Sequence, residues 1–521
     1  MRILLLLLLV ASAFAFVLQR GTYMGVDQGA TERLRYHAIP VAIAALYHGY
    51  PHDYTSRMFI AHPFQDVQVP IDERILEVIE AKAPDDPEIY FWAADDRGMA
   101  DYVIAAFKLF GPQVSSLYDF YFVLLLFSSL AFVLAYWHKK EMLCLLVFVL
   151  AGIATVVSVL PLVNHTLTEV GDPLSLPQVG LFESRIFDVL AYIAVLHVAL
   201  FVAKTERLSI LAALALLFQV SLFLFCYHAR SSLGWELVAM VLLNVYFSVK
   251  YLRGGGDLDD RGKIAAYGFA AFPVALLVGG LIALNVYKHQ TYHPQYFQEM
   301  GARTFWHNAL MGLGADRVLS RKYALQVDDR MVVDAVVKYV TEHQLLAPSE
   351  KWETQEILNS LGGATVFDWA KYEQYAKKLY FDIVATHPFR VLVVYALKKP
   401  LNALKLVIST VRAKGKPSMV EFRKRHGIFF NPFAWPLIVV VAMAMFLAGR
   451  RLVEPGPETT AVIVLLACSL IPSVAFYPAV LTLGGTFVSL TVLAYLLIPP
   501  MLYQLWLARP QGGFFGPLMI K

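Results

Sequence analysis

Acidic and basic side chains gather where the first apolar segment of the chain ends. The stretch GVDQGATERLRYHAIP at 25–40 carries Asp27 and Glu32 together with two arginines and a histidine. A second acidic cluster, Asp95, Asp96 and Asp101, precedes the next long apolar run. A carboxylate at a lipid surface is partly desolvated, which raises its pKa toward the range of a general base. These clusters are candidates for acid–base chemistry, and solvated caps of juxtamembrane helices are the alternative.

Ionisable residues also stand at the ends of later apolar runs. Arg185 opens one run, and His228 and Arg230 lie in the short connection between two others. Charges at membrane depth are costly to bury, so such residues are functional candidates by default. Ion pairs that lock helices together, for example Arg230 with Glu183, are the alternative interpretation.

A glycine-rich stretch, GARTFWHNALMGLGADRV at 301–318, places Trp306 and His307 side by side in the chain. It lacks the lysine of a phosphate-binding loop, so it is either a substrate-facing loop or a turn packed under an aromatic ring. Further on, Asp328 and Asp329 could bind a divalent cation through hard oxygen ligands or could cap a helix. The sequence assigns no metal-ligand set and no other cofactor.

The composition of the chain indicates a polytopic membrane protein. Of its 521 residues, 58% are hydrophobic and only 16% are charged, which is more apolar than a soluble domain. The net charge of +4 is too small to suggest a nucleic-acid partner. The three cysteines, Cys144, Cys226 and Cys468, fall in apolar runs without metal or disulfide spacing. The lipid bilayer is therefore the first partner that the sequence predicts.

We expect an all-α membrane protein with about ten transmembrane helices and two large helical segments on the outer face. The first apolar run resembles a signal peptide, but we expect it to be retained as a helix. The predicted spans are 3–18, 118–136, 142–162, 184–203, 208–226, 232–250, 264–287, 428–449, 459–477 and 482–507.

The short loops fix the predicted orientation. Loops 137–141, 204–207 and 250–263 carry Lys or Arg, whereas the alternating loop 164–184 has neither. Basic loops stay in the cytoplasm, which places the N-terminus inside. We expect a multi-pass protein of a bacterial inner (plasma) membrane.

The stretch 390–412 is long enough to cross the membrane, but Lys398, Lys399 and Pro400 would then lie at the bilayer centre. Each lysine there costs about 2.5–3.5 kcal/mol, and proline interrupts the helix. The basic loop 412–427 is the counter-argument, because the positive-inside rule favours the cytoplasm for it. We predict a helix along the outer interface, which gives ten spans with both termini inside.

The predicted organisation has seven parts. They are a first transmembrane helix (1–19), a first outer loop with juxtamembrane helices (20–117), transmembrane helices two to seven (118–287), an outer-face helical segment (288–389), a basic interfacial amphipathic segment (390–427), transmembrane helices eight to ten (428–507) and a tail (508–521).

The pattern resembles the GT-C class of polytopic glycosyltransferases, which use lipid-phosphate-linked sugars. In that class an Asp follows the first span in the first outer loop, and a helix then leads to a Gly-x-Pro turn. Here Asp27 is followed by a stretch of helical pattern that ends at Gly49-Tyr50-Pro51. Gln28 stands where the class often has a second acid, so Asp95 and Asp96 rival Asp27 as the catalytic acid.

Two further segments carry the resemblance. DDRGMADYVIAAFKLFGPQVSSLYDFYF at 95–122 resembles an interfacial helix that leads into the second span. RTFWHNALMGLG at 303–314, with the helical stretch 372–399 that contains a His-Pro turn, resembles the outer-face part of uncharacterised bacterial members. The resemblance covers the architecture of most of the chain, and its motifs are short.

The resemblance implies transfer of a sugar from a polyprenyl-phosphate donor to a hydroxyl of a glycan, lipid or protein acceptor, with inversion at the anomeric carbon. Such an enzyme needs a base for the acceptor proton and cations for the departing phosphate. The catalytic candidates are Asp27, Asp95 and Asp96. The substrate-binding candidates are Glu32, Arg185, His228, Arg230, His307, Lys398 and Lys399.

Two other classes of protein remain open at this point. Many spans and ionisable residues near the membrane also suit a transporter or a lipid flippase, although paired Gly/Pro-interrupted spans in corresponding halves are missing from the sequence. A membrane protein with a purely structural or assembly role is the third alternative.

Overall fold

The computed structural model describes most of residues 37–139 and 186–401. The gaps lie at 66–68, 84, 86–88, 92–97, 206–207, 231–232, 255–259, 300–304, 327, 362–366 and 400, and a few single positions between 142 and 153 are also described. The described chain is mostly helical, which agrees with the predicted all-α class. Four predicted spans lie outside the described residues, namely 3–18, 428–449, 459–477 and 482–507.

Three of the described helices are long and apolar enough to cross a membrane. They are α5 (Val114–Ala135), α9 (Ile210–Ala229) and the 32-residue α11 (Asp260–Thr291), which match the runs predicted at 118–136, 208–226 and 264–287. A fourth crossing is reached only if Trp369–Thr386 and Pro388–Lys398, which meet at 103°, count as one broken span. The described residues therefore reach three or four crossings, not ten.

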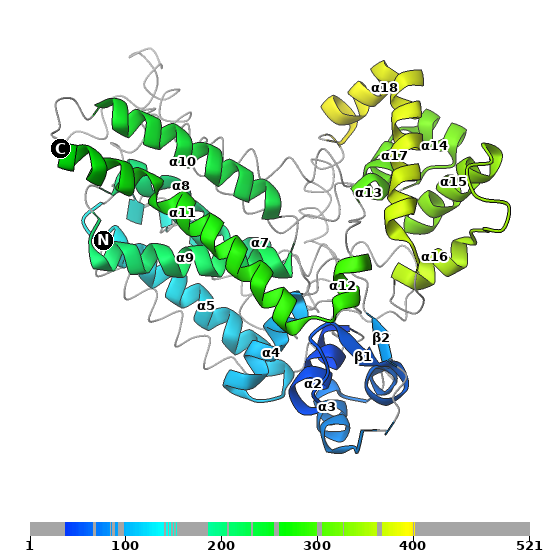
Figure 1. Cartoon of the computed structure of the whole chain (residues 1–521), viewed down its shortest axis with the longest axis horizontal. Coiled ribbons are helices and arrows are strands. Elements are labelled where there is room, and N and C mark those ends of the chain that lie inside the picture. Colours follow the sequence, from blue (N-terminus) through cyan, green and yellow to red (C-terminus); the bar gives the residue numbers. More distant parts are fainter. Residues whose placement is uncertain are drawn as a thin grey trace, which may run out of the picture.

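Two other predicted runs correspond to described helices. The run at 184–203 forms α7 (Ile186–Leu190) and α8 (Tyr192–Lys204), which Ala191 joins with helical backbone angles, and the run at 232–250 forms α10 (Gly234–Gly254). Most of the run predicted at 142–162 lies outside the described residues. Helix α8 packs against both α9 and α10, and α5 packs against α9, so these helices form one bundle (Figure 1).

Polar side chains also connect helices inside this bundle. Ser128 Oγ on α5 donates to Gln219 Oε1 on α9 at 2.8 Å, and Gln219 Nε2 donates back to Ser128 O at 2.8 Å. Because a buried polar group without a partner is costly, this reciprocal pair fixes the register of the two helices.

The polar segment before α5 forms a compact cap at one end of the bundle (Figure 1). Its elements are α2 (Ile39–Tyr47), β1 (Tyr54–Ser56), η3 (Arg57–Ala61), η4 (His62–Gln65), α3 (Ile71–Glu80), β2 (Ile89–Phe91) and α4 (Gly98–Phe110). The two strands are antiparallel, with Tyr54 opposite Phe91 and Ser56 opposite Ile89. We did not predict them, because three residues are too few for an alternating pattern to show.

The segment after α11 forms a second group of helices with its own core. After α12 (Pro294–Glu299) come α13 (Phe305–Leu313), α14 (Arg317–Tyr323), α15 (Asp329–Glu342), α16 (Thr354–Leu361), α17 (Trp369–Thr386), α18 (Pro388–Val393) and η6 (Val394–Lys398). We call residues 305–398 the helical lobe. Its buried core includes Leu310, Val336 and Tyr372 and is separate from the bundle core.

Two helices of the lobe follow apolar residues at helical spacing in the sequence. The pattern at 328–344 corresponds to α15, and the pattern at 365–388 corresponds to α17. Asp328 caps α15 by accepting a hydrogen bond from Met331 N at 3.1 Å. The structure thus shows the helix-cap role that was one of the two alternatives for Asp328.

Candidate functional site

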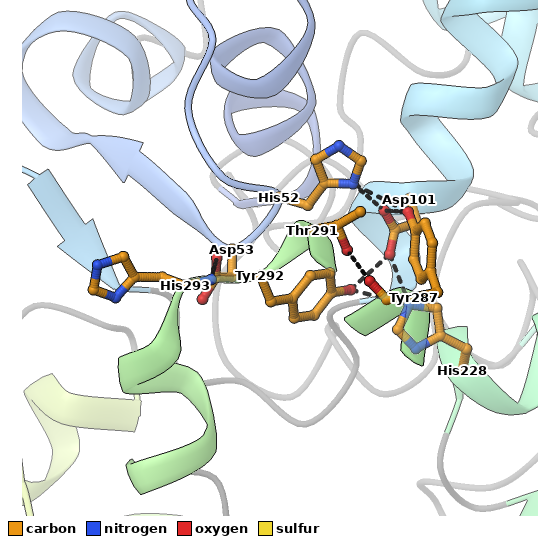
Figure 2. A network of polar contacts seen from close by, with 8 residues as sticks. All are labelled: His52, Asp53, Asp101, His228, Tyr287, Thr291, Tyr292 and His293. Carbon is orange, nitrogen blue, oxygen red and sulfur yellow. Dashed lines mark hydrogen bonds and ion pairs between the residues drawn. The ribbon is translucent and has the colours of Figure 1, made fainter. Parts of the chain in front are cut away.

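A buried carboxylate lies where the cap meets the ends of two long helices. Asp101 is in the first turn of α4 and is only 5% exposed. Helix α4 packs against α2, α5 and α9. The carboxylate of Asp101 therefore lies among side chains from the cap and from the ends of α9 and α11 (Figure 2).

Asp101 accepts hydrogen bonds from two histidines and two tyrosines, which we call the Asp101 network (Figure 2). The four contacts are His52 Nδ1 to Oδ1 at 2.7 Å, Tyr287 OH to Oδ1 at 2.7 Å, His228 Nε2 to Oδ2 at 2.7 Å and Tyr292 OH to Oδ2 at 2.6 Å. All four donors are side chains that can themselves gain or lose a proton.

Gly98 allows α4 to approach the end of α9 closely enough for this network. A Cβ at Gly98 would lie 2.4 Å from both the carbonyl carbon and the carbonyl oxygen of His228. No side chain fits at that distance. The absence of a side chain at Gly98 thus places the first turn of α4, and with it Asp101, directly beside His228.

Backbone contacts hold the His52 segment against the end of α11. His52 N donates to Thr291 O at 3.1 Å, and His293 N donates to Asp53 Oδ1 at 2.9 Å. A third contact joins Tyr54 OH and His293 Nδ1 at 3.0 Å. Figure 2 shows the contact between His293 and Asp53. The position of the His52 ring is therefore fixed by its neighbours in the chain as well as by Asp101.

The network keeps Asp101 ionised. Burial raises the pKa of Asp101, but the hydrogen bonds from His228, His52 and Tyr292 together outweigh burial and hold the pKa well below its ordinary value. Burial and the nearby Asp101 charge raise the pKa of Tyr292, which keeps its phenol protonated as a donor. Asp101 is thus a fixed negative charge whose acceptor sites are already used.

His52 is the member of the network that can reach a substrate. Its side chain is 22% exposed, and its Nε2 has no hydrogen-bond partner among the residues that the structure describes. Nδ1 donates to Asp101, so the neutral ring presents Nε2 as a proton acceptor. A carboxylate that orients an imidazole in this way is the arrangement by which histidine becomes an effective general base.

His228 has a different environment. Its side chain is 3% exposed, and its Nδ1 is buried without a hydrogen-bond partner among the described residues. Because solvent and large substrates cannot reach this ring, His228 supports the Asp101 carboxylate and does not present a base.

The residues predicted from the sequence are distributed over the molecule. His228 belongs to the network, and Arg230 ends α9 two residues later, where it is buried. Five candidates lie outside the described residues, namely Asp27, Glu32, Asp95, Asp96 and Arg185.

The remaining three candidates make their contacts within the helical lobe. His307 Nδ1 contacts Tyr372 OH at 2.8 Å, Lys398 pairs with Asp316, and the ammonium of Lys399 lies 4.5 Å from the centre of the Tyr395 ring.

Three members of the network were not among the site residues predicted from the sequence. His52 follows the Gly-Tyr-Pro turn directly, and Tyr287 and Tyr292 stand at the end of the run predicted at 264–287. Aromatic residues at the end of a span are common at membrane interfaces, so these tyrosines carry no distinctive signal. Asp101 was noted only as the last acid of a cluster.

No protein-family model, no curated protein and no solved structure matches the chain. Among the described residues, no group of three or more His, Cys, Asp or Glu could hold a metal ion. The chemistry of the Asp101 network therefore carries the functional proposal.

Proposed function

We propose that the protein is a membrane-embedded transferase that works at the Asp101 network, with His52 as the general base. The observation that carries this proposal is the ionised Asp101, which binds His52 Nδ1 while the His52 side chain is 22% exposed. The base is thereby assigned to His52 in place of Asp27. Asp27 and the acidic pair before α4 stay predictions.

The substrate class comes from the sequence resemblance to GT-C glycosyltransferases. A sugar on a polyprenyl phosphate carries its reacting carbon at the bilayer surface. The network lies at the α4–α9–α11 end of the bundle, where α9 and α11 are long enough to cross a membrane. We place this end at the outer face, in a chain with ten crossings and both termini in the cytoplasm, as the loop charges predict.

The proposed reaction is a single displacement. The acceptor hydroxyl gives its proton to His52 Nε2 while its oxygen forms a bond to the anomeric carbon. The bond between that carbon and the phosphate oxygen breaks, and the phosphate leaves with the electron pair. Asp101 stabilises the imidazolium that forms. One displacement inverts the anomeric configuration.

The second candidate function is proton-coupled transport. The observation that favours it is the buried contact between His228 and Asp101 at the end of α9, because paired acids and histidines in membrane bundles also form proton relays. The exposure of His52 favours the transferase, since a base for a hydroxyl needs access to an external substrate.

The test is transfer by the purified protein in proteoliposomes, with radiolabelled polyprenyl-phosphate hexoses and an extract of envelope acceptors. His52→Gln should lower the transfer rate about 10²–10⁴-fold, because it removes the base but retains a polar side chain. His48→Gln is the matched control, since His48 Nε2 contacts only Val78 O at 3.1 Å. Normal transfer by His52→Gln, or proton movement without any transfer, would overturn the proposal.

A further inference from the structure

Apolar side chains on α18 and η6 are exposed. Phe389 is 82% exposed, Leu392 is 62% exposed and Leu397 is 56% exposed, and Val393 and Leu401 are partly exposed too. Four of these residues are spaced four apart, at 389, 393, 397 and 401, which places them along one side of the helical segment. Exposed apolar patches of this kind mark an interaction surface.

Cations surround this apolar stripe. Arg390 is 48% exposed and Lys398 is 38% exposed, and both approach Asp316, which caps α14. Lys322 Nζ on α14 lies 3.0 Å from His387 Nε2 at the start of α18. The exposed basic residues of α14, Arg317, Arg321 and Lys322, therefore lie next to the apolar stripe although about 70 residues separate them in the chain.

The chain on both sides of the helical lobe returns to the membrane. Before the lobe comes α11, which is long and apolar enough to cross a bilayer. After Leu401 the sequence enters the apolar runs at 428–449, 459–477 and 482–507, each long enough to span. A lobe that is tethered at both ends in this way stays close to a lipid surface.

We infer that α18, η6 and the basic turn of α14 form a docking face for the lipid surface of the same membrane, with anionic phospholipid headgroups as the partner. The apolar stripe enters the acyl boundary, and the arginines and lysines bind the headgroup phosphates. The docking face adds α14 to the interfacial position that the sequence predicts for 390–412. The docking proposal does not depend on the transferase proposal.

The bend and the charges argue against a crossing by this segment. Helix α17 and the segment Pro388–Lys398 meet at 103°, so they do not continue as one rod. Arg390 and Lys398 would both have to enter the hydrocarbon, whereas at the interface their charged groups stay among headgroups.

The depth of the docking face can be measured on the full-length protein in vesicles. The three natural cysteines are replaced by alanine, Leu392→Cys carries an environment-sensitive nitrobenzoxadiazole label, and quencher lipids carry a nitroxide near the headgroup or at the chain end. Leu392→Cys should give blue-shifted emission that the headgroup-proximal nitroxide quenches most strongly. Glu342→Cys is the matched control, because Glu342 is 59% exposed on α15, and its label should report water.

Two results would overturn the depth assignment. Emission of a water-exposed label at 392 would show that no lipid covers the face, and strongest quenching from the chain-end nitroxide would show a crossing. A signal that changes with the protein-to-lipid ratio would show that a second copy of the chain covers the face instead.

The lipid chemistry is tested with charge variants. In vesicles that contain phosphatidylglycerol, quenching at 392 should be several-fold stronger than in pure phosphatidylcholine. The double variant Arg321→Gln/Lys322→Gln should remove most of that difference. The matched control Lys338→Gln/Lys351→Gln, at exposed positions outside the docking face, should keep it. An anionic-lipid effect that the first variant leaves unchanged would overturn the role of α14.

Discussion

The cap and the helical lobe both bury carboxylates, but these carboxylates have different hydrogen-bond partners. In the lobe, Glu373 accepts hydrogen bonds from the backbone N–H groups of Trp306 at 2.6 Å and His307 at 3.0 Å. In the cap, Asp101 accepts hydrogen bonds from side chains of histidine and tyrosine. A backbone N–H does not act as an acid or a base near neutral pH, so Glu373 has a structural role and fixes the start of α13. An imidazole can accept or donate a proton near neutral pH, so the Asp101 network contains groups that can act as an acid or a base.

Asp316 shows that a lowered pKa does not by itself distinguish the two roles. Burial raises the pKa of Asp316, but Lys398 and the backbone N–H groups of Leu319 and Val318 lower it below its ordinary value. Asp316 is nevertheless a helix cap, since its donors are the first turn of α14 and a surface lysine. The identity of the donors, more than the direction of the pKa shift, marks Asp101 as the functional carboxylate.

The replacement Asp101→Asn tests this contrast with the largest expected effect. It removes the charge that orients His52, so we expect transfer to fall about 10²–10⁴-fold. It also leaves His228 buried beside a neutral amide, so we expect a loss of about 3–5 kcal/mol in the free energy of unfolding. Transfer assays and thermal unfolding in detergent measure the two effects.

The matched control is Asp72→Asn, because Asp72 accepts a backbone hydrogen bond from Val114 N at 2.7 Å. This variant should keep its transfer rate. If Asp72→Asn and Asp101→Asn lose activity equally, the distinction between backbone-bound and side-chain-bound carboxylates does not hold.

Gly98→Ala should have the second-largest effect. The new methyl group would lie 2.4 Å from the His228 backbone, so α4 must move and the contact between Asp101 and His228 must lengthen. We expect transfer to fall at least about 10-fold, since small displacements in an active site are costly. Gly279→Ala on α11 is the control, as nothing lies within 4 Å of its new Cβ, and it should leave transfer unchanged.

Glu373→Gln should affect the lobe alone. The NH2 group of glutamine cannot accept a hydrogen bond, so one of the two backbone hydrogen bonds is lost and the other loses its charged acceptor. We expect the lobe to lose about 1–3 kcal/mol of stability. Amide hydrogen exchange in the first turn of α13 should accelerate, while transfer stays within about twofold of the unaltered protein. A large loss of transfer would show that the lobe is coupled to the Asp101 network.

The smallest expected effect is a pH dependence of stability. The folded pKa of Asp101 is depressed, so its charge stabilises the fold fully above the unfolded pKa of about 3.9. This contribution is lost as the pH falls from about 4 toward the folded pKa. The melting temperature of the unaltered protein should therefore decrease more steeply than that of Asp101→Asn between about pH 5 and pH 3. Parallel curves would contradict an ionised Asp101.

The long spans could be predicted because their signal is local. The helices α5, α9 and α11 coincide with uninterrupted apolar runs. In a bilayer, a run of that length must form its backbone hydrogen bonds within a helix. The run at 184–203 was predicted as one span and forms α7 and α8. The helix continues through Ala191, whose N donates to Phe187 O at 2.9 Å and whose O accepts from Val195 N at 2.9 Å.

The Asp101 network could be predicted only in part. His228 was a candidate because it lies at the end of an apolar run, whereas His52 and Tyr292 have ordinary neighbours in the sequence. The residues that meet Asp101 lie 49, 127, 186 and 191 positions away in the chain. Only the folded arrangement of the cap, α9 and α11 brings them together, and no spacing rule within one element gives that arrangement.

The length of α11 couples the Asp101 network to the thickness of the bilayer. Its 32 residues give a rod of about 48 Å, whereas the hydrocarbon layer is about 30 Å thick. Tyr287 lies just before the last turn of this rod, and Tyr292 follows its end directly. Hydrophobic mismatch in a thicker or thinner membrane would tilt α11 and raise or lower these two phenols relative to the headgroups. The acyl-chain length of the surrounding lipid would thus tune how deeply the reacting groups lie.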